Sequence, residues 1–320
     1  MNRRASGLLV ILAAACGKPG AGAGAGTGTA AAPAAPAPKA AAPASATGCE
    51  PLSFAPSTPV PEASGAGWMT IDGVLALVVI SDSGNAGAYG VVDPETGATL
   101  ETGVLPLGDV GDDVEGVSVV GDKLYGLTSA GWIRVWQRQG KGFALAGAPY
   151  AIGPVDLSDK SNNSHPPPGD GMVCGAHAGN CGRNYEGLCL LPSPPSKPGA
   201  CVGFAAAKAD GNLYCLTDEA GKLVVHRDRR LEVGKPGALA DCAFDDAGRL
   251  WLGANLFDLG TVSRVVPGAG GWDDIAHARV ESLGALSVGF PEVIAVRGDV
   301  VYRMSDLGGK PSLMARYRCH

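Results

Sequence analysis

The stretch DVEGVSVVGDKLYGLTS at residues 113–129 recurs without gaps as LADCAFDDAGRLWLGAN at 239–255 and FPEVIAVRGDVVYRMSD at 290–306. Each copy has an acidic residue at its third position, then an alternating strand, a Gly/Asp turn and a second strand with Tyr or Trp. A short polar residue lies 14 positions after the acid in all three copies. The repeat predicts one β-motif used several times along the chain.

Two further units depart from this pattern. NYEGLCL at 184–190 matches the first strand, and its second strand is expected at 212–218, so the 32-residue spacing from Glu186 to Asp218 implies an insertion of 18 residues. In the first unit, residues 67–82, Ala66 stands where the acid is expected and Asp82 comes two positions late. Successive units begin 49, 71, 55 and 51 residues apart.

A period near 50 residues with four short strands per unit is typical of a β-propeller. We therefore predict an all-β propeller with five recognisable blades, while the extra length at 143–183 forms either a sixth blade or a long loop. A sandwich of irregular strands is the competing all-β fold, but it does not explain the repeated spacing. The last unit has only three strands, so residues 49–54 are expected to pair with the C-terminal strand and close the ring.

Composition restricts the class of protein. Of the 320 residues, 46% are hydrophobic and 18% charged, which is typical of a globular chain. The net charge of −6, without a cluster of Lys and Arg, argues against nucleic acid as a partner. No run of 18 apolar residues occurs, so a polytopic membrane protein is excluded.

The N-terminus has the layout of a signal peptide over residues 1–15, with Arg3 and Arg4 before an apolar run. The small residues before Cys16 resemble the bacterial lipoprotein box, which implies cleavage before Cys16 and its acylation with palmitate or a similar chain. The alternative is ordinary secretion with Cys16 incidental. A Gly rather than an Asp after Cys16 favours the outer membrane over the inner one.

The next segment separates this anchor from the folded domain. Of residues 17–48, 26 of 32 are Ala, Gly or Pro, so residues 16–48 are predicted to be the lipidated cysteine and a disordered tether. Without the four basic residues of the first 48, the domain at 49–320 has a net charge of −10. We expect an extracytoplasmic, membrane-anchored domain whose acidity suits cations.

Eight cysteines remain, and an even number in an exported chain predicts disulfides. Ring closure predicts Cys49–Cys319, and Cys174–Cys181 would clip a Gly-rich loop. The remaining four are expected to pair as Cys189–Cys201 and Cys215–Cys242, although eight cysteines allow 105 pairings. A zinc site of Cys174, His177 and Cys181 is the alternative for the clip.

The repeated acids are the candidate site. Equivalent positions of a propeller meet at the central channel, so a ring of four carboxylates is predicted from Glu115, Glu186, Asp241 and Glu292. The four carboxylates repel one another unless a cation neutralises them. Hard oxygen ligands favour Ca²⁺ over Mg²⁺ as that cation. The alternatives are structural carboxylates that accept backbone hydrogen bonds, or a catalytic role.

Other polar residues lie near the predicted channel mouth. The residues that end the second strands are expected to begin turns rather than to bind a metal: Asp82, Ser129, Asp218, Asn255 and Asp306. The acidic loop 109–113 is placed to add ligands, and the long loop 151–183 to cap one mouth.

The strand starts DVEG at 113–116 and NYEG at 184–187, with SDSGN at 81–85, resemble the propellers called "esterase-like activity of phytase" and related calcium-binding bacterial propellers. The resemblance implies an axial metal and, in some members, phosphoester hydrolysis, with Glu115, Glu186 and Glu292 as channel carboxylates. This chain departs from the pattern in having no basic cluster for phosphates.

Three functions follow from these observations. The first is a lipid-anchored propeller that binds a divalent cation and a small-molecule or protein ligand at the channel face. The second is a metal-dependent phosphoester or ester hydrolase with a metal-bound water. The third is a structural or adhesive surface module. The sequence holds none of the common nucleophile or nucleotide motifs, so it identifies no catalytic residue.

Overall fold

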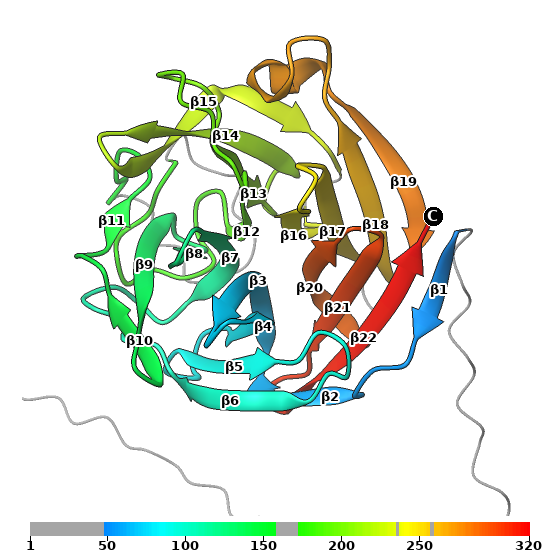
Figure 1. Ribbon diagram of the computed structural model, residues 1–320. Coiled ribbons are helices and arrows are strands. Elements are labelled where there is room, and N and C mark those ends of the chain that lie inside the picture. Colours follow the sequence, from blue (N-terminus) through cyan, green and yellow to red (C-terminus); the bar gives the residue numbers. More distant parts are fainter. Residues whose placement is uncertain (1–47, 158–171, 235–236, 257–258) are drawn as a thin grey trace, which may run out of the picture. The chain divides into compact units, whose positions relative to one another are not determined.

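The computed structural model describes residues 48–157, 172–234, 237–256 and 259–320, which form five antiparallel sheets arranged as blades around a channel (Figure 1). The predicted five-bladed propeller is confirmed. The extra length after residue 143 adds strand β11 (Tyr150–Ala151) to blade 2, and the described residues contain no sixth blade. The signal peptide, Cys16 and tether lie in 1–47, outside the described residues. No helix of the described part is long and apolar enough to cross a membrane.

The first three blades follow one another along the chain. Blade 1 consists of β3 (Ala63–Ile71), β4 (Val74–Ser81), β5 (Ala88–Val92) and β6 (Thr99–Val104). Blade 2 consists of β7 (Val114–Val120), β8 (Lys123–Thr128), β9 (Trp132–Gln139) and β10 (Gly142–Leu145), with β11 also paired to β9. Blade 3 consists of β12 (Tyr185–Leu190), β13 (Gly203–Ala207), β14 (Asn212–Glu219) and β15 (Lys222–Glu232).

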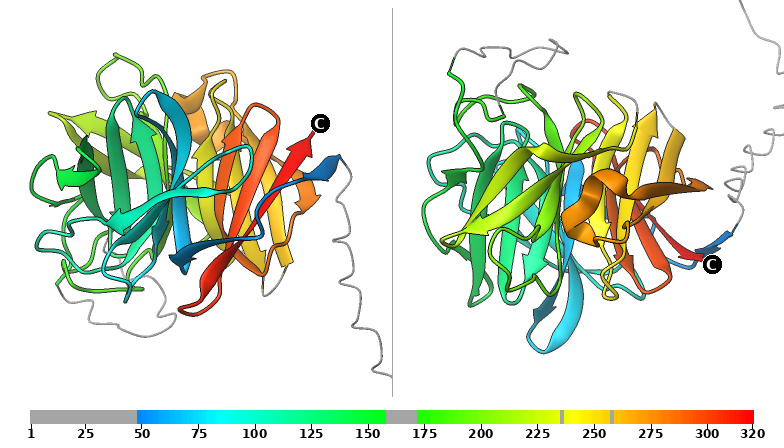
Figure 2. Two further views of the ribbon diagram at one scale, coloured as in Figure 1. Left: turned by 60° about the horizontal axis from the view of Figure 1, so that its bottom comes forward. Right: turned by 90° about the horizontal axis from the view of Figure 1, so that it is seen from above.

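Blade 4 consists of β16 (Leu239–Phe244), β17 (Leu250–Leu256), β18 (Leu259–Val266) and β19 (Arg279–Ala285), with the short helix η1 (Trp272–His277) before its last strand. Blade 5 consists of β20 (Phe290–Arg297), β21 (Val300–Asp306), β22 (Pro311–Cys319) and β1 (Cys49–Leu52). Strand β2 (Ser57–Pro61) also pairs with β22. The first and last strands, blue and red in Figure 2, therefore share one blade, as predicted. Cys49 and Cys319 are partners in this pairing.

The hydrophobic core lies between the blades. Five buried clusters each combine residues of two neighbouring blades. Between blades 1 and 2, for example, Met69 and Ile80 pack with Trp136, and between blades 5 and 1 Leu77 packs with Tyr302. The strands have apolar residues on both faces. This fits the arrangement, because a neighbouring blade covers each face of a sheet. The ring is thus held by blade-to-blade burial.

The structure corrects the predicted strands of blade 3. The second strand of this blade is β13, and the segment 212–218 belongs to β14, the third strand. The implied insertion is therefore a loop followed by a short strand, Gly203–Ala207, which contains three alanines. Alanine is depleted in strands, so the sequence pattern did not mark it.

Each inner strand has a β-bulge near its start. The residue skipped in the pairing is Ser64 in β3, Glu115 in β7, Glu186 in β12 and Glu292 in β20. In blade 4 it is Ala240, so Asp241 comes one residue late. A bulge leaves its residue unpaired and turns its side chain away from the regular pleat, and bulges are common beside functional sites.

The glycine after the bulged acid serves packing between blades. A Cβ on Gly116 would lie 2.3 Å from the Leu188 backbone nitrogen, and one on Gly187 would lie 2.9 Å from the Cys242 nitrogen. The inner strands of blades 2, 3 and 4 therefore approach each other too closely for a side chain. This contact explains why Glu-Gly recurs in the sequence.

Four disulfides are present. Cys49–Cys319 and Cys174–Cys181 form as predicted. The other predicted pairs are wrong, because the structure joins Cys189 to Cys242 and Cys201 to Cys215. The inner strands β12 and β16 lie side by side, which brings the Cα atoms of Cys189 and Cys242 to 5.6 Å although they are 53 residues apart in sequence. The zinc alternative for Cys174 and Cys181 is replaced by the disulfide.

Candidate functional site

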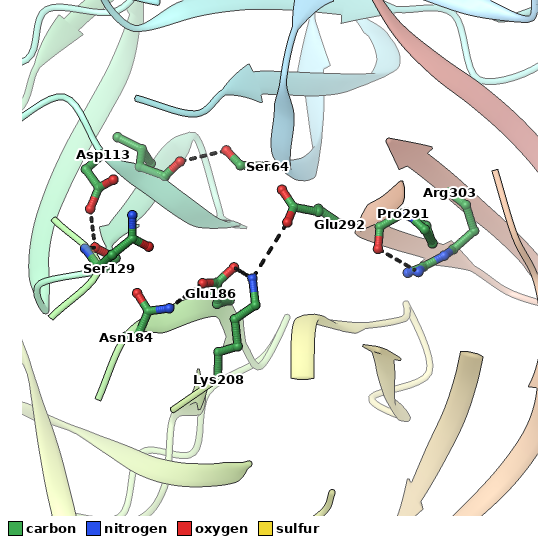
Figure 3. A network of polar contacts seen from close by, with 11 residues as sticks. Ser64, Asp113, Ser129, Asn184, Glu186, Lys208, Pro291, Glu292 and Arg303 are labelled. Carbon is green, nitrogen blue, oxygen red and sulfur yellow. Dashed lines mark hydrogen bonds and ion pairs between the residues drawn. The ribbon is translucent and has the colours of Figure 1, made fainter. Parts of the chain in front are cut away.

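Three of the four predicted carboxylates meet at one end of the channel. Glu115, Glu186 and Glu292 occupy the bulges of three inner strands, and they are only 4%, 3% and 7% exposed. Mutual repulsion acts between the three carboxyl groups. The bulges therefore direct side chains from blades 2, 3 and 5 toward one another (Figure 3 shows Glu186 and Glu292).

Asp241 has a different role from these three. Because it follows the bulge of blade 4 by one residue, it is not equivalent to them. Its Oδ1 accepts the Cys242 backbone N–H at 2.7 Å, and its Oδ2 accepts the Ile294 N–H of blade 5 at 2.9 Å. Both oxygens thus accept hydrogen bonds from backbone amides, one of them across a blade boundary. This fits the alternative in which the carboxylate has a structural role.

A second set of equivalent positions surrounds the bulged residues. The backbone N–H of Asp82, Ser129, Lys208 and Asn255 each bonds the carbonyl two residues before a bulge, and Asp306 pairs at the same place in blade 5. The sequence pattern assigned four of these residues to turns. It assigned Asp218 in place of Lys208, because β13 was missed. Asp82 does accept a turn hydrogen bond from the Ser83 N–H, but it also belongs to the acidic cluster described next.

Asp82, Asp113 and Glu115 form the acidic cluster. One oxygen of each lies within 4.8 Å of the others, and Asp113 and Glu115 are buried. Asp113 accepts the Ser129 hydroxyl, while Glu115 has no hydrogen-bond partner among the described residues except Asp82. No Lys, Arg or His of the described chain forms an ion pair with any of the three. Lys208 attracts Glu115 and Arg134 attracts Asp113 only from beyond ion-pair distance, so no basic group of the described residues touches the cluster.

Lys208 neutralises the other side of the channel, and sequence reasoning missed it. Its Nζ lies 3.1 Å from Glu186 Oε2 and 3.7 Å from Glu292 Oε1 (Figure 3). Asn184 adds a hydrogen bond of 2.8 Å from its Nδ2 to Glu186 Oε1. One lysine thus links carboxylates of blades 3 and 5. The only signal in the sequence was the small, apolar run before Lys208, which is a weak indication of a strand.

Burial shifts the acidity of these groups strongly. It is the largest cause of a raised pKa for Asp113, to about 6, for Glu186, to about 7, and for Glu292, to about 8. Lys208 lowers the pKa of Glu186 and of Glu292, but burial outweighs it. The pKa of Glu115 is raised well above its ordinary value by burial and by Glu186, Asp82 and Asp113. At neutral pH the channel therefore requires bound protons or a further cation.

The loop after residue 171 borders this end of the channel. The Gly111 N–H bonds the Ala176 carbonyl, and the Asn180 N–H bonds the Ser129 hydroxyl. A cavity of about 260 Å³ lies beside the cluster and is lined by Ser83, Gly111, Asp112, Asp113 and residues 177–180. The described part of the loop, with its Cys174–Cys181 clip, thus lies at the acidic mouth. Residues 158–171 lie outside the described part.

A second cavity, of about 370 Å³, lies at the far ends of the inner strands. Its lining includes Trp68, Phe244 and Val296, and it contains none of the acidic cluster. The larger hollow and the concentrated charge therefore occupy opposite ends of the channel. We place the candidate site at the acidic end, because the chemistry is concentrated there.

Comparison with known proteins adds little about activity. No protein-family model matches this sequence, so the phytase-like resemblance stays a prediction, and no curated protein matches it. A solved PQQ-bound aldose sugar dehydrogenase from Streptomyces coelicolor matches with a TM-score of 0.46 and 15% identity, over 86% of this chain and 99% of that one. Glutaminyl cyclase from Myxococcus xanthus matches with a TM-score of 0.46 and 14% identity, over 85% and 97%. Similarities this distant carry no argument about function.

Proposed function

We propose that the acidic mouth of this propeller binds a divalent cation, preferably Ca²⁺, and through it a ligand in the adjoining cavity. The observation that carries the proposal is the acidic cluster: one oxygen each of Asp82, Asp113 and Glu115 lies within 4.8 Å of the others, and no described basic group is within ion-pair distance of them. Glu115 is buried, and its only hydrogen-bond partner among the described residues is a second carboxyl group, Asp82, so a cation would relieve the repulsion between the two.

The donor set favours calcium. All three ligands are hard carboxylate oxygens, and Ca²⁺ accepts six to eight oxygens in flexible geometry. The cavity of about 260 Å³ beside Asp113 has room for waters or for oxygen atoms of a ligand that complete the coordination. Magnesium requires a more regular octahedron, which three carboxylates from two blades and a loop do not impose.

Calcium titration of the purified domain, by isothermal calorimetry after chelator treatment, tests the proposal. We expect a Kd in the range of about 10⁻⁶ to 10⁻³ M, as in protein calcium sites of intermediate and low affinity. Glu115→Gln should weaken binding by at least about 100-fold, whereas Glu232→Gln, an exposed site on β15, should leave it unchanged. Equal binding by both variants, or none by the wild type, would reject the proposal.

Metal-dependent hydrolysis is the second candidate, and the cavity beside the cluster favours it, because a substrate and a water have room next to the proposed cation. The test is turnover of p-nitrophenyl phosphate and p-nitrophenyl acetate with calcium and with EGTA. Turnover that disappears with EGTA and in Glu115→Gln would select the hydrolase. Calcium binding without turnover would select the ligand-binding function. If the protein shows neither calcium binding nor turnover, the structural or adhesive module is the remaining candidate.

We further propose the lipid anchor at Cys16 and an extracytoplasmic location, with the outer membrane preferred. The four disulfides support an oxidising compartment. The test is incorporation of labelled palmitate in a bacterial host. The label should be lost in Cys16→Ser, and equal labelling of both forms would exclude this anchor.

A further inference from the structure

Lys208 divides the carboxylates of the channel into two groups. Glu186 and Glu292 are both within 4 Å of its Nζ, whereas Asp82, Asp113 and Glu115 form no ion pair with any described basic residue. The side chain of Lys208 is only 21% exposed, so the ammonium group is held inside the ring rather than in solvent. Lys208 attracts Glu115 as well, but from a longer range, so only Glu186 and Glu292 are in direct contact with its ammonium group.

The position of Lys208 in the fold explains this division. It follows β13, at the place that Asp82, Ser129, Asn255 and Asp306 occupy in the other blades. Only in blade 3 is this place taken by a basic residue. Its ammonium group therefore enters the ring that the bulged acids form, opposite Asn184, whose N–H donor already binds Glu186.

An ammonium group and a calcium ion compete for the same oxygens. The ammonium donates hydrogen bonds to carboxylates, while calcium coordinates them directly, and the two positive charges repel each other at short range. A cation near Glu186 or Glu292 would have to displace the lysine. The Asp82, Asp113 and Glu115 oxygens have no such competitor.

We propose that Lys208 is a built-in counter-ion that confines the divalent cation to Asp82, Asp113 and Glu115, and so limits the channel to one bound cation. This inference rests on the proposed cation site. Without the ammonium group, Glu186, Glu292 and the buried, unpartnered Oδ1 of Asn184 become a second set of oxygen ligands. Lys208 is therefore the residue that decides how many cations the channel holds and where.

The test compares Lys208→Met with the wild type by calcium titration at low ionic strength. Lys208→Met keeps an unbranched side chain and removes the charge. We expect one calcium per wild-type chain and two in Lys208→Met. Lys208→Arg, which keeps the charge, should stay near the wild type. Lys310→Met makes the same charge change at an exposed position in the turn before β22 and should not alter binding.

The two hypotheses fail in different ways. Absence of calcium binding by the wild type rejects the proposed cation site. A wild type that binds one calcium, with the same number in a folded Lys208→Met, rejects the role of Lys208 alone. If Lys208→Met does not fold, Glu186→Gln decides: confinement predicts a loss of less than about 10-fold, against at least about 100-fold in Glu115→Gln. Equal losses in these two variants overturn the proposal.

Discussion

Removal of the disulfide that closes the ring tests how this propeller is held together. Cys49 and Cys319 are both buried and are partners in the β1–β22 pair, which joins the two ends of the domain together with the β2–β22 pair. The double variant Cys49→Ala, Cys319→Ala leaves the backbone pairing in place and removes the covalent link together with two buried sulfur atoms, a packing loss that Cys174→Ala, Cys181→Ala shares. Its effect therefore reports what the link adds to closure.

The expected loss follows from sequence separation. The bond joins residues 270 positions apart, and the entropy of closing a loop of that length corresponds to about 5–6 kcal/mol of unfolding free energy. The Cys174–Cys181 bond spans only 7 positions, for which the same relation gives about 2 kcal/mol. The predicted difference between the two double variants is therefore about 3 kcal/mol, which corresponds to several degrees in melting temperature.

Equilibrium unfolding in urea, followed by tryptophan fluorescence and circular dichroism under non-reducing conditions, measures both variants. We expect Cys49→Ala, Cys319→Ala to lose clearly more stability than Cys174→Ala, Cys181→Ala. Equal losses would refute the reasoning, because chain entropy would then not be the main contribution of the closing bond. A larger m-value in the first variant would give further support, since its unfolded chain exposes more surface.

Three further predictions concern the channel and its packing. In EGTA, the free energy of unfolding should fall by a few kcal/mol between pH 5 and pH 9, because folding raises the pKa of Glu186 from 4.5 to about 7 and that of Glu292 from 4.5 to about 8. This contribution is complete below pH 4.5 and is lost as the pH rises through 7 and 8, so a flat urea profile would contradict it. Calcium at about 100 times its Kd should add about 2.7 kcal/mol to the free energy of unfolding, which raises the melting temperature by several degrees. Glu115→Gln should show no such rise, and an equal rise in that variant would count against the site. Gly116→Ala should cost about 1–3 kcal/mol because its Cβ would lie 2.3 Å from the Leu188 nitrogen, while Gly147→Ala, in open space, serves as the control for the thermal melts.

Much of the architecture could be predicted because it depends on patterns within short stretches of the sequence. The alternation of apolar residues, the Gly/Asp turns and the period near 50 residues each depend on a short stretch of chain. Ring closure followed from the count of strands in the last unit, and Cys49–Cys319 followed from closure. Three of the four acids came together for the same reason, since Glu115, Glu186 and Glu292 begin equivalent strands.

Two of the departures, those at Asp241 and Asp82, have one physical origin, which is strand register. Asp241 matches the other acids in a gapless alignment, yet the bulge of blade 4 falls on Ala240, so its side chain accepts amide protons instead. In blade 1 the bulge falls on Ser64 rather than near Ala66, which makes Asp82 equivalent to Ser129 of blade 2. A shift of one residue redirects a strand's side chains, and only hydrogen-bond pairing shows where the shift lies.

The amino-acid sequence by itself thus determined a propeller of repeated hairpins, the closure of its ring and an acidic channel. It could do so because periodicity and residue type are properties of neighbouring residues. The tertiary structure decided which carboxylates form the cluster, which are paired with Lys208, and which cysteines are bonded. These features depend on contacts between blades, where residues distant in sequence approach within a few ångströms. A lysine after an alanine-rich strand becomes part of the site only when that strand takes its place beside the channel.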